Sequence, residues 1–224
     1  NTTSTRRANA VAFDIREAGR IKREGGTLSG KIMKDEDGNP LKTPGLFKDV
    51  KGIGWFIEEY GVAQISYNLT DINISPLHEV FDKTCERSIA RGMRVTGSEL
   101  IGLVPKKVLI DAGKHFLKKQ KRSTGISESE IIKIAIKTLG LDELATFNPE
   151  ERIIEYMLDA DANKPLVNMS LTDFADETAS ESPAPGGGSI SAYAGAMGIS
   201  LGTMVSNLSA HKRGWDDRWE EFSA

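Results

Sequence analysis

The chain has 224 residues, of which 39% are hydrophobic and 27% are charged, and its formal net charge is −3. Basic and acidic residues are interleaved, which argues against a nucleic-acid partner. One cysteine, Cys85, excludes an intrachain disulfide and is typical of a reducing, cytoplasmic compartment, and with three scattered histidines it also argues against a metal centre.

The first hundred residues predict a helix, two strands, a helix and a strand, in that order. Apolar residues at helical spacing, with Thr3, Ser4 or Thr5 as N-cap, predict the first helix over Ala8, Val11, Ala12, Ile15 and Ala18. The runs 51–60 and 62–71 are strand-like and meet at Gly61, which predicts a hairpin. Ser75 is expected to cap a second helix, with Pro76 at its first position, and residues 94–104 are expected to form a third strand.

This order predicts an α+β fold, a ferredoxin-like split βαβ unit that lacks its opening strand. The opening strand is central in that fold, so its absence would expose ladder groups along two strands, which isolated domains avoid. We therefore expect the sequence to be a fragment of a longer polypeptide.

The second half of the chain reads as helical. Helices are predicted near residues 106–119, 128–139 and 149–158, so residues 1–158 are expected to form one domain with a helical C-terminal extension. Residues 159–169 read as a linker, and 170–224 as the first helices of an all-α bundle. The lysine-rich run 114–122 has two readings, a docking surface for a polyanion or a solvated helix end.

Residues 182–210 carry no charge and open with SPAPGGGS. A phosphate loop needs a lysine after its glycines, and none follows here. The segment is long enough to span a membrane, but its serines, threonine and asparagine make it too polar. Its small residues instead predict a closely packed soluble helix. Amides at the start of that helix suit an anionic ligand group, the alternative being a glycine linker, and we assign them to Gly186, Gly187, Gly188 and Ser189.

Strand alternation predicts the two faces of the hairpin. Ile53, Trp55 and Ile57 share one face of the first strand, and Gly52 and Gly54 share the other. The second strand separates an apolar set from a polar one: Ile65, Tyr67 and Leu69 against Gln64, Ser66, Asn68 and Thr70. With helices covering the apolar side, the glycines and polar residues would form a floor, either for a ligand or merely solvated.

Four stretches carry a resemblance. The segment SPAPGGGSISAYAGAMGISLGTMVS resembles the opening of the cyclodeaminase domain of the formiminotransferase-cyclodeaminase family. The segments KGIGWFIEEYGVAQISYNLTD, VTGSELIGLVP and NPEERIIEYML are similar to the second subdomain of the family's formiminotransferase domain. These stretches follow the family's order and are joined by a linker where the family has one.

The resemblance implies folate chemistry in histidine degradation. One domain would transfer a formimino group from N-formimino-L-glutamate to tetrahydrofolate, releasing glutamate, and the other would cyclise formiminotetrahydrofolate to methenyltetrahydrofolate and ammonia. It implies tetrahydrofolate as co-substrate, no metal, a cytoplasmic homo-oligomer, and no nucleic-acid or membrane partner. The family's catalytic histidine and aspartate match no position here, and His78, His115 and His211 are not candidates for that base.

The expected role of this chain is therefore to supply a substrate-binding surface without catalytic residues. The polar floor would bind folate or formiminoglutamate, Ser98 and Glu99 would contact the cleft or form an edge turn, and Trp55 is assigned to the core rather than to a pterin-stacking platform. Alone, the chain is expected to be inactive. The alternatives are a non-catalytic ferredoxin-like binding or oligomerisation module, and a membrane-associated protein that uses residues 182–210.

Overall fold

The computed structural model of the chain describes residues 1–26, 30–159 and 164–223. These residues form two compact units: Asn1–Leu100 with Leu139–Thr146, and Ile101–Thr138 with Phe147–Ala224. The fold mixes helices with two small antiparallel sheets of two strands each, which is compatible with the predicted α+β class.

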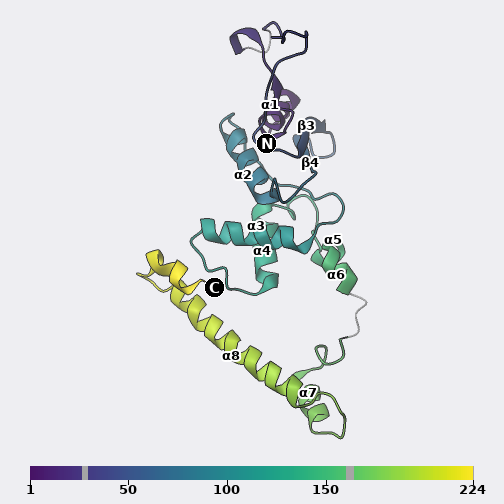
Figure 1. Cartoon of the computed structure of the whole chain (residues 1–224), viewed down its shortest axis with the longest axis vertical. Coiled ribbons are helices and arrows are strands. Elements are labelled where there is room, and N and C mark those ends of the chain that lie inside the picture. Colours follow the sequence, from purple (N-terminus) through teal and green to yellow (C-terminus); the bar gives the residue numbers. More distant parts are fainter. Residues whose placement is uncertain (27–29, 160–163, 224) are drawn as a thin grey trace. The chain divides into compact units, whose positions relative to one another are not determined.

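The first unit is built on one helix and one hairpin (Figure 1). Helix α1, Thr5–Ile15, is capped by Ser4, whose hydroxyl oxygen accepts a hydrogen bond from the Arg7 amide at 3.3 Å. Strands β3, Val50–Ile57, and β4, Val62–Leu69, are antiparallel, and Gly61 turns between them with a φ of 64°. The predicted helix and hairpin are confirmed.

One face of the hairpin packs on α1, and α1 packs in turn on α2, Leu77–Ile89. The core at this face is apolar and has contributions from the sheet, both helices and the chain that follows them: Val11, Ile15, Val50, Val80 and Met93, flanked by Phe47, Ile65, Tyr67 and Leu69. The glycines of β3 belong to this covered face, because Gly52 is paired with Tyr67 and Gly54 with Ile65.

The predicted assignment of β3 to faces was therefore wrong. The register pairs Ile53 with Ser66 and Trp55 with Gln64, so the large apolar residues of β3 lie beside the polar residues of β4. Residues directly opposite in a ladder share a face, and each strand's own alternation does not say which faces coincide. Ile53 is 52% exposed and Trp55 is 49% exposed, so Trp55 is not in the core.

Two further expectations for this unit were wrong. Residues 94–103 form no strand, and Val104 makes only an isolated parallel bridge with Ile153. A strand persists only where a neighbouring ladder satisfies its backbone, and in the described residues no strand forms a ladder with 94–103: Arg94 bonds Asn1, and the Ser98 amide bonds the Gly140 carbonyl. Ser75 does not cap α2, because its hydroxyl donates to the Lys48 carbonyl at 2.6 Å and Pro76 occupies the N-cap position.

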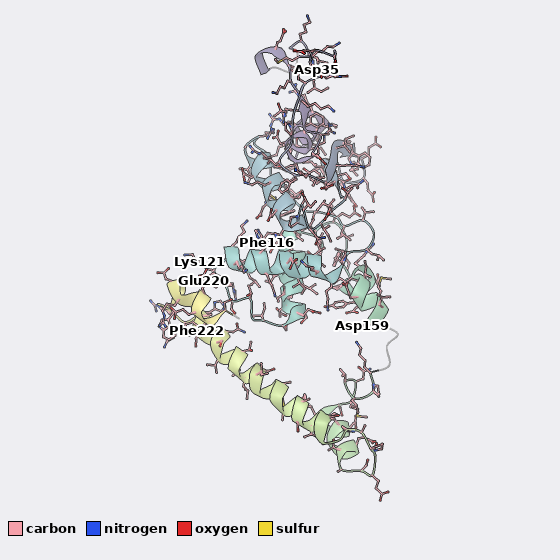
Figure 2. The ribbon with its side chains drawn as sticks, viewed as in Figure 1. Asp35, Phe116, Lys121, Asp159, Glu220 and Phe222 are labelled. Carbon is pink, nitrogen blue, oxygen red and sulfur yellow. The ribbon has the colours of Figure 1, made fainter. Side chains whose placement is uncertain are left out.

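Between α1 and β3, within the first unit, the chain makes a small polar excursion. Strands β1, Arg20–Ile21, and β2, Lys42–Thr43, pair at its base, and the short helix η1, Glu24–Gly26, follows β1. Asp35 lies in its turn, where a carboxylate oxygen accepts the amide of Asn39 at 2.7 Å (Figure 2).

The second unit is helical. Its elements are α3, Lys106–Lys119; α4, Glu128–Leu139; α5, Pro149–Arg152; α6, Ile154–Asp159; α7, Leu171–Thr178; α8, Gly187–Ala210; and η2, Asp216–Phe222. Helices α3 and α4 cross at Gly113, where a Cβ would lie 2.2 Å from the Ile131 carbonyl oxygen (Figure 1). Phe116 of α3, marked in Figure 2, is buried. The helix expected over 149–158 is divided at Ile153, a fully buried residue with extended backbone that bridges Val104.

Helix α8 is long and largely exposed to solvent. Its large apolar side chains are exposed over its whole length: Ile190, Tyr193, Met197, Ile199, Leu201, Met204, Val205 and Leu208. Even so, among the helices of the described ranges none combines the length and the apolar character that crossing a membrane requires.

Candidate functional site

The face of the β3–β4 hairpin that points away from α1 is the candidate binding surface, and we call it the outer face. It consists of Lys51, Ile53, Trp55 and Ile57 of β3 and Val62, Gln64, Ser66 and Asn68 of β4. The register places four pairs side by side on this face, and in three of them the member from β4 is polar. At its centre, the apolar Ile53 and Trp55 therefore lie beside the hydrogen-bonding groups of Ser66 and Gln64.

The polar row is available to a ligand. In the part of the chain that the structure describes, the side chains of Gln64, Ser66 and Asn68 make no hydrogen bond. Thr70 differs, because its hydroxyl donates to the Asp49 carbonyl at 3.0 Å. An amide, a hydroxyl and a second amide thus remain beside Trp55, while Thr70 is engaged at the end of the strand.

The two glycines of β3 lie on the opposite face, so they are not part of a ligand floor. A Cβ on Gly54 would lie 2.5 Å from the backbone nitrogen of Asn9, and a Cβ on Gly52 would lie 2.7 Å from the ring of Tyr67. Close approach does explain both glycines, but the approaching groups are α1 and Tyr67.

Asn9 holds α1 to β3 and was not among the predicted site residues. Its side-chain amide donates to the Gly54 carbonyl at 2.6 Å, and its side-chain oxygen accepts the Gly54 amide at 3.0 Å. Arg16 donates to the Gly52 carbonyl at 3.0 Å and the Glu17 amide donates to the Val50 carbonyl at 2.9 Å. The signal would have been the match between a helical asparagine and a strand glycine 45 residues later, which no periodicity reveals.

Ser98 and Glu99 have different surroundings. The Ser98 amide donates to the Gly140 carbonyl at 2.9 Å, and its hydroxyl donates to the carbonyl of Leu139. Ser98 is thus engaged in closing the turn after α4. Glu99 is exposed, and its charge is the largest cause of a raised pKa at Tyr60, which lies in the hairpin turn.

The proposed anion site at the start of α8 is open. Gly186 is the N-cap, and the helix begins at Gly187 with no side-chain cap. The amides of residues 187–189 donate no hydrogen bond to any described residue, and a Cβ on Gly187 or Gly188 would meet nothing within 4 Å. These four positions therefore stay predicted anion contacts.

The two tyrosines with strongly raised pKa values, Tyr67 and Tyr156, make structural hydrogen bonds. Burial raises the pKa of Tyr67, and its phenol oxygen accepts a hydrogen bond from Thr84 at 3.1 Å. In the second unit, burial and then the hydrogen bond to Glu128 raise the pKa of Tyr156 to about 12. In the described ranges, no group of three or more His, Cys, Asp or Glu side chains has an arrangement that would hold a metal ion.

Comparison with known families assigns both halves of the chain. Residues 1–159 match the family described as Formiminotransferase domain, and residues 170–224 match the family described as Formiminotransferase-cyclodeaminase. A relative from Gallus gallus, Formimidoyltransferase-cyclodeaminase, is 44% identical over 179 residues, which is 80% of this chain and 33% of the relative. The protein of the same name from Mus musculus is 37% identical over 218 residues, 96% of this chain and 37% of the relative.

A shorter relative matches only part of the chain. Glutamate formimidoyltransferase from Streptococcus pyogenes serotype M1 is 36% identical over 73 residues, 33% of this chain and 24% of the relative. The chain spans about a third of the length of the curated bifunctional relatives it matches, with 33% and 37% of the two described above. Because a family match covers most of its residues, the chain belongs to the formiminotransferase-cyclodeaminase family.

Proposed function

We propose that this chain is part of a bifunctional folate enzyme of histidine degradation. The enzyme would transfer a formimino group from N-formimino-L-glutamate to tetrahydrofolate and then cyclodeaminate the product to methenyltetrahydrofolate and ammonia. The family membership and the names of the relatives support this proposal. Residues 1–158 would belong to the transferase domain and 170–224 to the cyclodeaminase domain, joined by a linker at 159–169.

The outer face would supply the substrate-binding surface of the transferase. One observation carries this proposal: free polar groups of Gln64, Ser66 and Asn68 lie in a row beside the half-exposed Trp55. A flat heteroaromatic ring gains area and ring contacts on a tryptophan, and its ring nitrogens and carbonyl need hydrogen-bonding partners. Folate has both features, so the two rows match it.

The chain would orient substrate without performing proton transfer. Formimino transfer needs an amine nucleophile, a base for its proton, and donors for the developing tetrahedral centre. Gln64, Ser66 and Asn68 would supply donors and position, and the base would come from elsewhere in the enzyme. The amides of Gly186, Gly187, Gly188 and Ser189 would bind an anionic group in the cyclodeaminase half.

Fluorescence titration tests the outer face. In a Trp215→Phe, Trp219→Phe background, Trp55 is the remaining tryptophan, and folinate binding is expected to quench it. Gln64→Ala removes one polar partner and is expected to weaken binding about tenfold, whereas Gln120→Ala on α3's C-cap is the matched control. Equal affinity of the two variants, or quenching that never saturates, would contradict the proposal. Turnover of formiminoglutamate by the chain alone would contradict the assignment of the base to other residues.

We also propose that the first unit is the ferredoxin-like subdomain, with a further strand along the outer edge of β4. The Ala63 amide already donates to the Thr2 carbonyl at 2.6 Å on that edge. Such a strand would give residues 94–103 a ladder neighbour. The full-length enzyme is expected to protect the amides of residues 63–69 against hydrogen exchange more strongly than this chain alone, and equal protection would contradict this arrangement.

A second candidate function is assembly, and the bare surface of α8 favours it. Its exposed apolar length would be buried in a helical bundle of a cytoplasmic homo-oligomer. Size-exclusion chromatography with added folinate separates the candidates, because a pure assembly module would oligomerise without binding the folate.

A further inference from the structure

A hollow in the first unit is lined by arginines and lies away from the outer face. Its volume is about 270 Å³, and its lining residues are Arg6, Arg7, Ala10 and Arg91. Pockets for drug-sized ligands measure about 300–1,000 Å³, so this one suits a smaller molecule.

Two of the three lining arginines are held in place. Arg7 donates to the Arg91 carbonyl at 2.9 Å, and Arg91 donates to the Arg87 carbonyl at 2.9 Å. The other end of the Arg91 guanidinium pairs with Asp14, which also pairs with Arg20. Arg7 and Arg91 are therefore preorganised, and Asp14 offsets only part of the positive charge of the hollow, because its carboxylate is shared between Arg91 and Arg20.

The third arginine, Arg6, is available to a ligand. Within the described residues the Arg6 guanidinium makes no hydrogen bond or ion pair, and the residue is exposed. Arg6 and Arg7 stand in the first turn of α1, which holds no acidic residue. A helix N-terminus carries a partial positive charge, so cations there are unfavourable unless an anion offsets them.

We propose that this hollow binds a small oligo-anion, a compact molecule with at least two carboxylate or phosphate groups. Guanidinium groups make paired hydrogen bonds with both kinds of oxygen, and three arginines around one hollow favour a ligand with more than one negative charge. The ligand would bridge α1 and the segment after α2. Arg7 and Arg91 would bind one of its anionic groups, and Arg6 would bind another.

Calorimetric titration of the whole chain tests this site with two probes, citrate for carboxylates and pyrophosphate for phosphates, at a constant ionic strength of about 0.15 M, where the Debye length is about 8 Å. We expect saturable 1:1 binding of at least one probe, and the tighter probe identifies the chemistry. Arg6→Gln is expected to weaken that binding about tenfold, since one charge-assisted contact is lost. Arg6→Lys keeps the charge and is expected to lose less.

Arg213→Gln is the matched control, because Arg213 is an exposed arginine of the other unit. Arg6 makes no described contact, so its replacement leaves the fold intact, which circular dichroism verifies. Failure of both probes to saturate, or equal affinities for Arg6→Gln and Arg213→Gln, would overturn the proposal. No folate is present in this titration, so its outcome is independent of the outer face.

Discussion

Replacing Gly54 with alanine tests the contact on which the assignment of the two sheet faces depends. The new Cβ would lie 2.5 Å from the Asn9 nitrogen and 2.6 Å from the Ala8 carbonyl carbon, and both are backbone atoms of a helix. A flexible side chain would yield, but here α1 itself must move off β3. The hydrogen bonds between the Asn9 side chain and Gly54 would stretch with it.

The expected cost follows from two contributions. Overpacking of a close contact costs about 1–3 kcal/mol, and the two hydrogen bonds, weakened rather than lost, together cost about 1 kcal/mol more. We therefore expect Gly54→Ala to lower the free energy of unfolding by about 2–4 kcal/mol, which moves the urea midpoint by about 1–2 M for a typical small-domain m-value. Trp55 adjoins the substitution, so its fluorescence in a Trp215→Phe, Trp219→Phe background reports on this unit.

A double-mutant cycle separates the helix contact from general damage. If α1 is displaced in Gly54→Ala, a further Asn9→Ala change removes hydrogen bonds that are already weak. The double variant should then lose about 1 kcal/mol less stability than the sum of the two single losses. Gly61→Ala is the control: its φ is 64° and its Cβ would meet nothing within 4 Å, so it strains only the turn. Its cost of about 1–2 kcal/mol should add to that of Asn9→Ala. Additive costs for Gly54→Ala and Asn9→Ala, or a Gly54→Ala cost below about 0.5 kcal/mol, would refute the covered glycine face.

Three other changes have expected outcomes. Tyr156→Phe should reduce the loss of stability between pH 10 and about pH 12. The pKa of Tyr156 is raised from 10.0 to about 12 in the folded state, so the stabilisation from its neutral form is lost as pH rises through that range. Identical urea unfolding curves for variant and parent at alkaline pH would contradict this prediction. The hydrogen bond from Lys106 lowers the pKa of Glu128, so this carboxylate contributes stability above its ordinary pKa of 4.5 and loses it on acidification. Glu128→Gln should remove that contribution. The effect is small because the pair is partly exposed, and it is measured as a difference in stability between variant and parent as the pH is lowered. Gly198→Ala should stabilise the chain by up to about 1 kcal/mol, since its Cβ would meet nothing within 4 Å inside α8, and destabilisation in thermal unfolding would indicate a close helix contact there.

Local patterns were sufficient to predict the helices. The predicted bounds of α3 and α4 agree with Lys106–Lys119 and Glu128–Leu139, because a buried face at helical spacing and a stop signal both lie within the segment itself. The predicted cap of α1 was likewise local. The break at Ile153 was not predictable in this way, because it depends on a bridge to Val104, 49 residues earlier.

The candidate site depended on information that the strands do not carry separately. Alternation correctly divided each strand into two sets, but the relative register of β3 and β4 decides which sets share a face. The apolar Ile53 and Trp55 therefore came to lie beside Ser66 and Gln64, and the glycines beside Tyr67 and Ile65. Gln64, Ser66 and Asn68 remain candidate ligand contacts, whereas the glycines are explained by a helix whose approach no local pattern encodes.

The amide of Asn9 has a consequence for how copies of this hairpin meet. By bonding both backbone groups of Gly54, it closes the free side of β3 as a terminating cap would, and Arg16 blocks the position next to it. Sideways growth of the ribbon is then limited to the β4 side. Two copies that paired along β4 would form a closed two-fold dimer with no open sheet edge. An extended cross-β assembly needs two open edges on every copy, so it could not grow from this hairpin.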